Sequence, residues 1–196
     1  MGSEPLVTIF TPSYNHEKYL DDYFQGLLSQ TYRNIQLIII DDGSTDRSWD
    51  KICSYEAELK RKFSSVILER HENIGPLQEM TRAFEKVEGE FYCVLESDDY
   101  YLPTKIEENV RYLQQHPDVG VVHSEIDYIY GNTIQRRHWE TVGRSIPCGE
   151  IFQPLVLDNF IMTCSVACRT DLFRRYTNIE EYISKGYIAG DYAMFL

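Results

Sequence analysis

Hydrophobic residues in the first half of the chain follow two alternating periodicities. Short apolar runs predict strands that are covered on both faces, and these runs are Leu6–Phe10, Ile35–Ile40, Val66–Leu68 and Phe91–Leu95. Between successive runs, apolar residues recur three and four positions apart, which is the spacing of a helix with one buried face. The order β-α-β-α-β-α-β predicts an α/β fold with a mostly parallel central sheet flanked by helices.

Local signals predict where three of these helices begin. Ser44-Thr45-Asp46 offers N-cap side chains, and Pro76 suits the first position of a helix. Thr104 and Glu107 have the spacing of a capping box, in which each side chain bonds the backbone near the other. We therefore expect helices that start close to these residues.

The pattern changes in the second half of the chain. Ile126–Tyr130 and Thr133–Arg137 flank Gly131-Asn132, which predicts a β-hairpin. Ile161–Cys168 is a further strand candidate, and Asp171–Tyr176 is expected to be a short helix. No linker or internal repeat separates the halves, so we expect one domain over the whole chain.

Composition and charge narrow the classes of partner. The formal net charge is -12 at pH 7, and no Lys/Arg cluster forms a stripe, which argues against a nucleic-acid partner. The five cysteines are odd in number and lack paired CxxC spacing, which argues against zinc and against a disulfide framework. A reducing compartment such as the cytoplasm fits best, and no apolar stretch approaches the roughly 20 residues that span a bilayer.

Polar residues directly after three of the predicted strands are the main functional signal. The carboxyl ends of parallel strands share one edge of the sheet, where ligands bind. The carboxylates in Glu96-Ser97-Asp98-Asp99 would repel one another without a cation, and Mg²⁺ or Mn²⁺ takes such oxygens together with substrate phosphates. A metal–diphosphate site is one interpretation, and an acidic surface turn is the other.

The other two strand ends suit a nucleotide. Tyr14 can stack on a base, and Asp41 or Asp42 can accept a hydrogen bond from a base N–H, while Asp98 and Asp99 can reach a ribose and a metal. GxGxxG is missing after the first strand, and no GxxxxGK[ST] occurs, so neither a dinucleotide dehydrogenase nor a P-loop NTPase is supported. Two-metal phosphoryl chemistry on the acid cluster keeps a sugar-phosphate nucleotidyltransferase as an alternative.

Several motifs follow one another in order along the chain, namely Val7–Asn15, Ser29–Tyr32, Ile40–Asp46, Asn73–Gly75 and Gly89–Phe91 preceding Glu96–Asp99. Together these motifs resemble family 2 glycosyltransferases. The resemblance covers essentially the whole chain and implies the GT-A fold and inverting transfer from a nucleotide-sugar donor. It implies a nucleotide-sugar-binding half over about residues 5–103 and an acceptor-side half with the hairpin over about 104–196, which we expect to be truncated at its C-terminus.

The resemblance also implies roles for single residues in donor binding. Thr11 and Tyr14 match residues that contact the nucleobase, and Asp42 matches the residue that hydrogen-bonds the base. Asp98 matches a residue near the ribose and sugar, and Asp99 matches the ligand of a divalent metal, Mn²⁺ or Mg²⁺, on the diphosphate.

The catalytic base implied by the resemblance is Asp191. In the family an acidic pair usually opens this helix, whereas here Gly190 replaces the first acid. That departure keeps a catalytically impaired nucleotide-sugar-binding module as another alternative. Glu96 likewise replaces the more usual Asp at the start of the acid cluster.

The resemblance further implies partners and location. The favoured donor is a UDP-sugar, and the acceptor is a glycan or a lipid-linked glycan in polysaccharide, lipopolysaccharide or other cell-surface synthesis. We expect a cytoplasmic protein, with peripheral association at the inner face of the membrane through a missing segment as an option. The donor sugar, the acceptor and the oligomeric state do not follow from the sequence.

Overall fold

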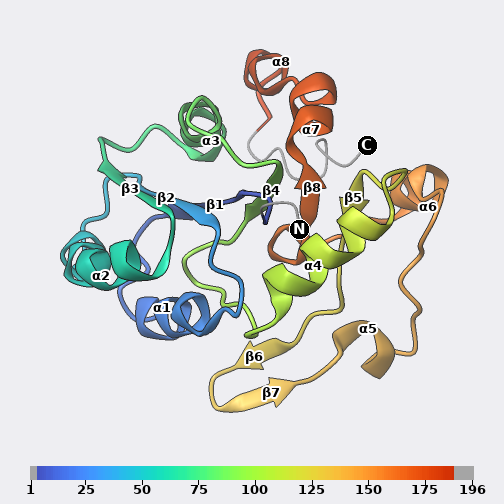
Figure 1. Ribbon diagram of the computed structural model, residues 1–196, viewed down its shortest axis with the longest axis horizontal. Helices are drawn as coiled ribbons and strands as arrows, with labels where there is room; N and C mark the ends of the chain where they lie inside the picture. The colour runs from blue at the N-terminus through green and yellow to red at the C-terminus, as the bar shows by residue number, and fades with distance from the viewer. Residues whose placement is uncertain (1–3, 188–196) are drawn as a thin grey trace.

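A computed structural model describes residues 4–187, and Figure 1 shows helices on both faces of a central sheet. In this part of the chain the sheet has the strand order β3-β2-β1-β4-β8-β5. Its parallel strands are β1 (Val7–Ser13), β2 (Ile35–Asp41), β3 (Ser65–Arg70) and β4 (Phe91–Val94). The antiparallel strands that complete it are β8 (Ala167–Arg169) and β5 (Val121–Val122). The mostly parallel α/β sheet predicted from the sequence is therefore confirmed.

Helices form a layer on each face of the sheet (Figure 1). One layer consists of α1 (Leu20–Ser29), α2 (Ser48–Lys62) and α4 (Lys105–Gln115). The other consists of α3 (Pro76–Phe84), α7 (Thr170–Tyr176) and α8 (Ile179–Ser184). Each layer has its own buried hydrophobic cluster, and alternate residues of the strands supply both, as Ile9 and Phe10 of β1 do.

The segment between β5 and β8 is built from short elements. It contains the hairpin β6 (Tyr128–Tyr130) and β7 (Thr133–Gln135), then α5 (His138–Thr141), α6 (Phe152–Leu157) and a 3₁₀ turn (Thr163–Ser165). The hairpin forms a separate two-stranded antiparallel sheet, with Gly131 in the left-handed region at φ 57°. The predicted hairpin is thus confirmed. Trp139 and Leu155 belong to a third, small hydrophobic cluster in this segment.

The second helix begins at Ser48, close to the expected N-cap residues, and the Asp46 carboxylate accepts from the Ser48 backbone N–H at 2.9 Å as a cap would. Two other local predictions need correction. Thr104 is the N-cap of α4, but its side chain makes no capping bond, and Glu107 accepts from the Thr31 hydroxyl instead. The continuous strand expected over Ile161–Cys168 is wrong.

The reason for this last difference is a half-buried lysine, Lys105. Lys105 Nζ donates to the Ser165 carbonyl oxygen at 2.5 Å, and the Ser165 backbone N–H donates to Met162. These bonds fold the chain into the 3₁₀ turn, and strand pairing begins only at Ala167.

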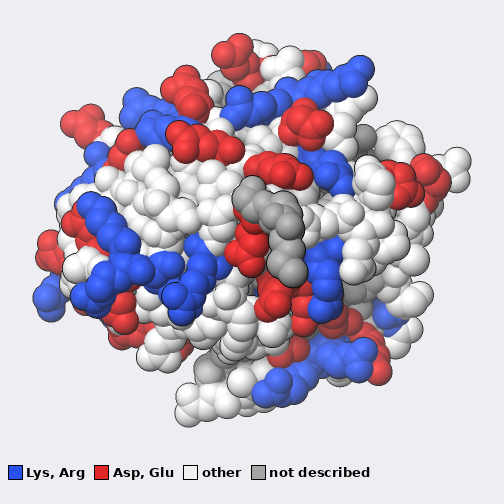
Figure 2. Space-filling model, viewed as in Figure 1, with Lys and Arg blue, Asp and Glu red and all other residues white. Residues whose placement is uncertain are grey.

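Charge is mixed over the face of the molecule drawn in Figure 2. Lys and Arg side chains lie among Asp and Glu side chains there, without a continuous basic area. In the described part of the chain, no helix has the length and apolar content that a bilayer crossing requires.

Candidate functional site

The polar ends of three neighbouring strands meet at one edge of the sheet. β1 lies between β2 and β4, and in the parallel register Ser13 pairs with Asp41 while Phe10 pairs with Val94. The strand ends are tied further by a bond from the Ser97 backbone N–H to the Pro12 carbonyl oxygen at 3.3 Å. The prediction that these ends share one edge is confirmed.

Asn15 and His16, in the loop after β1, link the three strand ends. Asn15 adopts φ 57°, and its side-chain oxygen accepts from the Thr45 backbone N–H at 2.8 Å. His16 Nδ1 lies 2.8 Å from the Ser97 hydroxyl and 3.6 Å from the Asp98 carboxylate. His16 therefore connects the β1 loop to the acid cluster, a role that the sequence did not signal.

Asp42 holds the turn in front of α3. The residue is only 4% exposed. Its carboxylate accepts from the backbone N–H groups of Ile74 at 2.8 Å and Gly75 at 3.0 Å. His71 Nδ1 lies 3.3 Å from the same carboxylate. Gly43 follows at φ 76°, and a Cβ there would lie 2.8 Å from the Asn73 backbone nitrogen, so only glycine fits this close approach.

Asp41 is buried beside Asp42, and Arg70 at the end of β3 compensates its charge. One Asp41 oxygen accepts from the Ser44 backbone N–H at 3.0 Å and lies 3.2 Å from Arg70 Nε. Glu79 of α3 is buried behind this pair. Burial, reinforced by the charges of Asp42 and Asp41, raises the pKa of Glu79 to about 9, and a hydrogen bond from the Ser13 backbone opposes the shift.

The residues predicted to contact the nucleobase are placed differently from one another. Tyr14 is 45% exposed at the rim of the edge, where its ring is accessible to a ligand. Thr11 is fully buried, and its hydroxyl lies 2.6 Å from the Tyr23 hydroxyl of α1. The Thr11 hydroxyl is thus paired with Tyr23 inside the core. Burial also raises the pKa of Tyr23.

The acid cluster after β4 brings together three groups that could hold a metal ion. One ligand atom each from Glu96, Asp99 and Cys164 lies within 4.8 Å of the others. Two carboxylates suit a hard divalent ion, and the thiol adds a softer ligand, so the set fits a divalent cation. Asp98 points to the His16 side instead, with 44% of its side chain exposed.

Asp99 and Cys164 perturb each other within this group. Although Asp99 is exposed, desolvation by surrounding atoms raises the pKa of its carboxyl group, and Asp98 adds to the shift. A hydrogen bond from the Cys164 thiol and the nearby His16 act in the opposite direction. Burial and the charges of Asp99 and Glu96 raise the pKa of the Cys164 thiol in turn. A bound cation would relieve both effects, because it favours the ionised form of each ligand.

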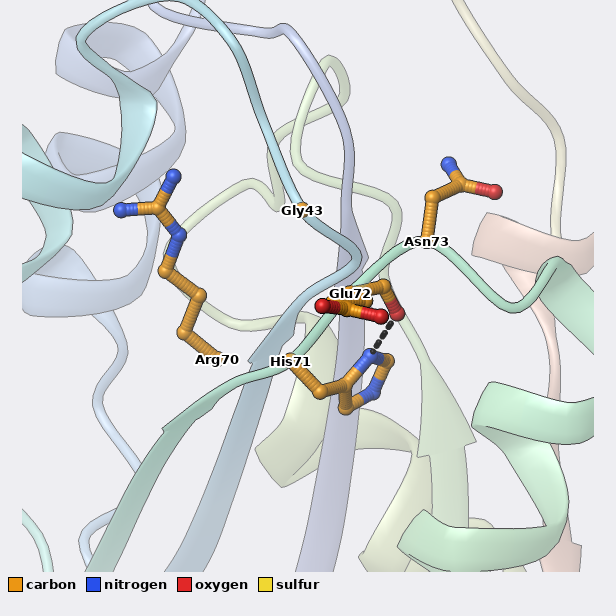
Figure 3. Close-up of a pocket in the computed structure, with 5 residues that line it drawn as sticks. All are labelled: Gly43, Arg70, His71, Glu72 and Asn73. Atoms are coloured by element: carbon orange, nitrogen blue, oxygen red, sulfur yellow. Dashed lines mark hydrogen bonds between the residues drawn. The ribbon is translucent and has the colours of Figure 1, made fainter.

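A surface hollow of about 510 Å³ lies at the ends of β2 and β3. Figure 3 shows its lining, with Arg70 and Asn73 directed away from each other and His71 bonded to the Glu72 carbonyl oxygen at 2.8 Å. The hollow adjoins Gly43, so it opens beside the turn that follows Asp42. The sequence predicted the acidic side of this edge but not its β3 side.

Asp191, the predicted catalytic base, lies outside the described residues, as does Gly190.

Comparison with known proteins decides the family. The model of the family described as Glycosyl transferase family 2 matches residues 8–195. The chain belongs to glycosyl transferase family 2. This membership agrees with the resemblance found in the sequence motifs.

Two curated relatives of this family 2 chain are bacterial. TuaG of Bacillus subtilis strain 168, whose name assigns it to teichuronic acid biosynthesis as a glycosyltransferase, is 33% identical over 112 residues, or 57% of this chain and 43% of TuaG. An uncharacterised glycosyltransferase of Haemophilus influenzae is 26% identical over 162 residues, or 82% of this chain and 47% of the relative. The chain thus spans less than half the length of these relatives.

Solved structures similar to this family 2 chain share its GT-A fold. S. aureus TarS 1-349 in complex with UDP matches with a TM-score of 0.65 and 21% identity, over 89% of this chain and 50% of that one. The mannosyltransferase PcManGT from Pyrobaculum calidifontis, in complex with GDP-Man and Mn²⁺, matches with a TM-score of 0.65 and 17% identity, over 88% and 46%. The GT-A fold class predicted from the sequence is confirmed.

Proposed function

We propose that this family 2 chain transfers a sugar from a nucleoside-diphosphate sugar to an acceptor hydroxyl with inversion of configuration. The observation that carries the proposal is the meeting of three polar strand ends at one edge, with a buried carboxylate at Asp42 and a metal-compatible group at Glu96, Asp99 and Cys164. Family membership supports glycosyl transfer over nucleotidyl transfer.

The donor site combines both sides of this edge. The exposed ring of Tyr14 stacks on the base, and Asp42, held by two backbone N–H groups, presents its remaining lone pairs to a base N–H. Asp98, exposed next to His16, accepts from the ribose hydroxyls. UDP is the favoured nucleotide, since TarS is solved with UDP, while the GDP-Man complex of PcManGT makes GDP the second candidate.

The metal site serves the diphosphate. Asp99, with Glu96 and Cys164 beside it, would hold Mn²⁺ or Mg²⁺. A cation bound there supplies Lewis-acid stabilisation of the leaving diphosphate. Asp191 takes the proton from the acceptor hydroxyl as the acceptor oxygen attacks the anomeric carbon, so one displacement inverts that centre.

The acceptor and the cellular role are proposed more broadly. In the proposed division, about residues 5–103 form the nucleotide-sugar-binding half and about residues 104–196 the acceptor-side half. The acceptor is a glycan or a lipid-linked glycan of the cell surface. TuaG, whose name places it in teichuronic acid biosynthesis, supports a cell-surface polysaccharide. A cytoplasmic location, at or near the inner face of the membrane, fits a nucleotide-sugar donor.

The test is calorimetric binding of UDP, GDP and dTDP with and without Mn²⁺. We expect one nucleotide to bind more tightly with the metal, and Asp99→Ala to remove that metal dependence. Asp118→Ala, which truncates an exposed aspartate after α4, is the matched control and should bind as the wild type does.

The catalytic step is tested separately from binding. Asp191→Asn should abolish sugar transfer and leave nucleotide binding nearly intact, since it removes a proton acceptor and keeps the shape of the side chain. Equal loss of transfer and binding would remove Asp191 from the role of base. If no nucleotide of the panel binds to the wild type, the proposed donor site is wrong.

A further inference from the structure

The position of Glu79 ties it to the turn that Asp42 holds. Glu79 lies in the first turns of α3 and is 2% exposed. Its backbone N–H donates to the Gly75 carbonyl oxygen at 3.1 Å, while the Gly75 N–H donates to Asp42 at 3.0 Å. The short segment from Gly75 to Glu79 therefore includes both the turn that Asp42 holds and the buried Glu79 carboxyl group.

The charges that face Glu79 leave it without a compensating cation. In the described part of the chain Glu79 has no ion pair, because Arg70 is engaged with Asp41 at 3.2 Å and His71 with Asp42 at 3.3 Å. The groups that act on Glu79 are the like charges of Asp41 at the end of β2 and Asp42 directly after it, together with the Ser13 backbone of β1. A buried carboxyl group in such surroundings keeps its proton.

Buried polar atoms without partners gather at the same place. Among the described residues they include Ser13 Oγ, Asp41 Oδ2, His71 Nε2 and Glu79 Oε1. Ser13 and Asp41 are register partners, and the His71 backbone N–H donates to the Asp41 carbonyl oxygen at 3.2 Å. A protonated carboxyl group offers the O–H donor that carboxylate oxygens require. Buried groups of this kind call for a functional explanation, because they lower stability.

We propose that Glu79 is a positioning residue of the nucleotide site, whose buried carboxyl group supports the Asp41–Asp42 pair from behind and keeps Asp42 on the Ile74–Gly75 turn. The inference rests on the proposed function, because it requires Asp42 to bind the nucleobase. Glu79 acts through Asp42 and does not touch the nucleotide. A third negative charge here would repel Asp42 and loosen the turn, so nucleotide affinity should fall when Glu79 ionises.

The pH profile of UDP affinity tests this role, with GDP as the probe if only GDP binds. For the wild type, we expect the Kd for UDP to rise by up to about tenfold per pH unit once the pH exceeds the pKa of Glu79, which is about 9. Glu79→Gln keeps the shape and cannot ionise, so its Kd should rise less. The uracil ring N–H also titrates in alkaline solution, so the readout is the ratio of the two Kd values at each pH.

Glu85→Gln is the matched control. It makes the same chemical change at an exposed residue directly after α3 and should follow the wild-type profile.

Thermal unfolding provides a readout that needs no nucleotide. Glu79 keeps its proton in the folded state up to about pH 9, whereas the unfolded chain releases it near its ordinary value of 4.5. The unfolded state therefore binds fewer protons between these values, and wild-type stability falls as the pH rises through this window. Glu79→Gln lacks this loss, so its Tm advantage over the wild type should grow up to about pH 9 and then level off.

Each result decides the inference. A Kd ratio that changes with pH, together with a growing Tm difference, supports the positioning role. A Tm difference that does not change with pH would show that Glu79 is already ionised in the folded protein. A growing Tm difference with a constant Kd ratio would show that Glu79 has a purely structural role. Either result overturns the inference while the proposed function stands. Failure of the wild type to bind UDP, GDP or dTDP at neutral pH would overturn the proposed function, and this inference with it.

Discussion

Asp42 joins the end of β2 to the turn before α3 through both of its carboxylate oxygens. A carboxylate has about four lone-pair positions, so two backbone bonds leave capacity for one ligand N–H. The same residue thus shapes the loop and, in the proposed function, recognises the base. Substitutions of Asp42 should therefore change both the free energy of unfolding and the nucleotide affinity.

Asp42→Asn should weaken both the turn before α3 and nucleotide binding. An amide offers one acceptor oxygen, and its NH₂ group would face the other backbone N–H, so we expect the free energy of unfolding to fall by about 1–3 kcal/mol. The Kd for UDP should rise at least about tenfold, which corresponds to about 1.4 kcal/mol. Urea unfolding and calorimetry give the two values.

Asp50→Asn is its control, since it makes the same change at an exposed position of α2. Reduced stability in Asp42→Asn with unchanged UDP affinity would leave Asp42 its structural role and contradict its contact with the base.

Single residues differed in how far the sequence could locate them. Asp42 and Asp99 were found because they follow apolar strands directly, and parallel strands place such residues at one edge. Glu79 could not be found, since a glutamate within an amphipathic helix usually faces solvent, and its burial beside the ends of β1 and β2 follows from tertiary folding. The contact of Cys164 with Asp99 likewise depends on tertiary folding between distant segments.

The loops after β1 and β2 behave as one element, because Asn15 connects them. Its side-chain oxygen accepts from the backbone N–H groups of Thr45 and Asp46 at 2.8 and 3.4 Å, and its own backbone N–H donates to the Ser44 hydroxyl at 2.9 Å. The left-handed conformation of Asn15 directs these groups toward the β2 loop. The geometry of this edge of the sheet therefore depends on the left-handed conformation of Asn15.

Asn15→Ala and Asn15→Gly separate the contribution of the Asn15 side-chain hydrogen bonds from that of its left-handed backbone conformation. Both lose the side-chain bonds, so both should lower the free energy of unfolding and weaken UDP binding. Alanine also carries the cost of a positive φ, which is about 1–2 kcal/mol, so Asn15→Ala should be less stable than Asn15→Gly. Urea midpoints compare them, and equal stability would show that the backbone conformation relaxes.

Whole elements were predictable where a local pattern specifies them. Apolar runs and helical spacing located β1 to β4 and the helices between them, and Gly131-Asn132 located the hairpin. The segment over Ile161–Cys168 was wrong, because its conformation follows from the bond between Lys105 and Ser165, far apart in sequence. The antiparallel direction of β8 is equally a product of tertiary structure.

The whole molecule carries a formal net charge of -12 at pH 7. Many of its ion pairs lie at the surface, such as Lys60 with Glu56 and Lys185 with Glu181, and pairs of this kind contribute little to stability. We therefore expect repulsion among the excess acidic groups to outweigh them and, in the proposed function, to disfavour the approach of an anionic donor.

Salt should accordingly stabilise the protein. Raising NaCl from about 20 mM to about 300 mM shortens the screening length, so we expect Tm to rise by a few degrees. Tetramethylammonium chloride at the same ionic strength is the control against specific Na⁺ binding and should give the same shift. A fall in Tm would show that attractive pairs dominate the electrostatic balance.

The parallel strands β1 to β4 all come from residues 7–94, whereas β8, which pairs with β4, begins at residue 167. Closing such a long loop costs more entropy than joining neighbouring strands, so this pairing should form late. During synthesis, which proceeds from the N-terminus, the first strands can assemble while the outer side of β4 is still an open edge. An open edge templates association with other chains, so a ribosome that stalls before β8 would release an aggregation-prone fragment.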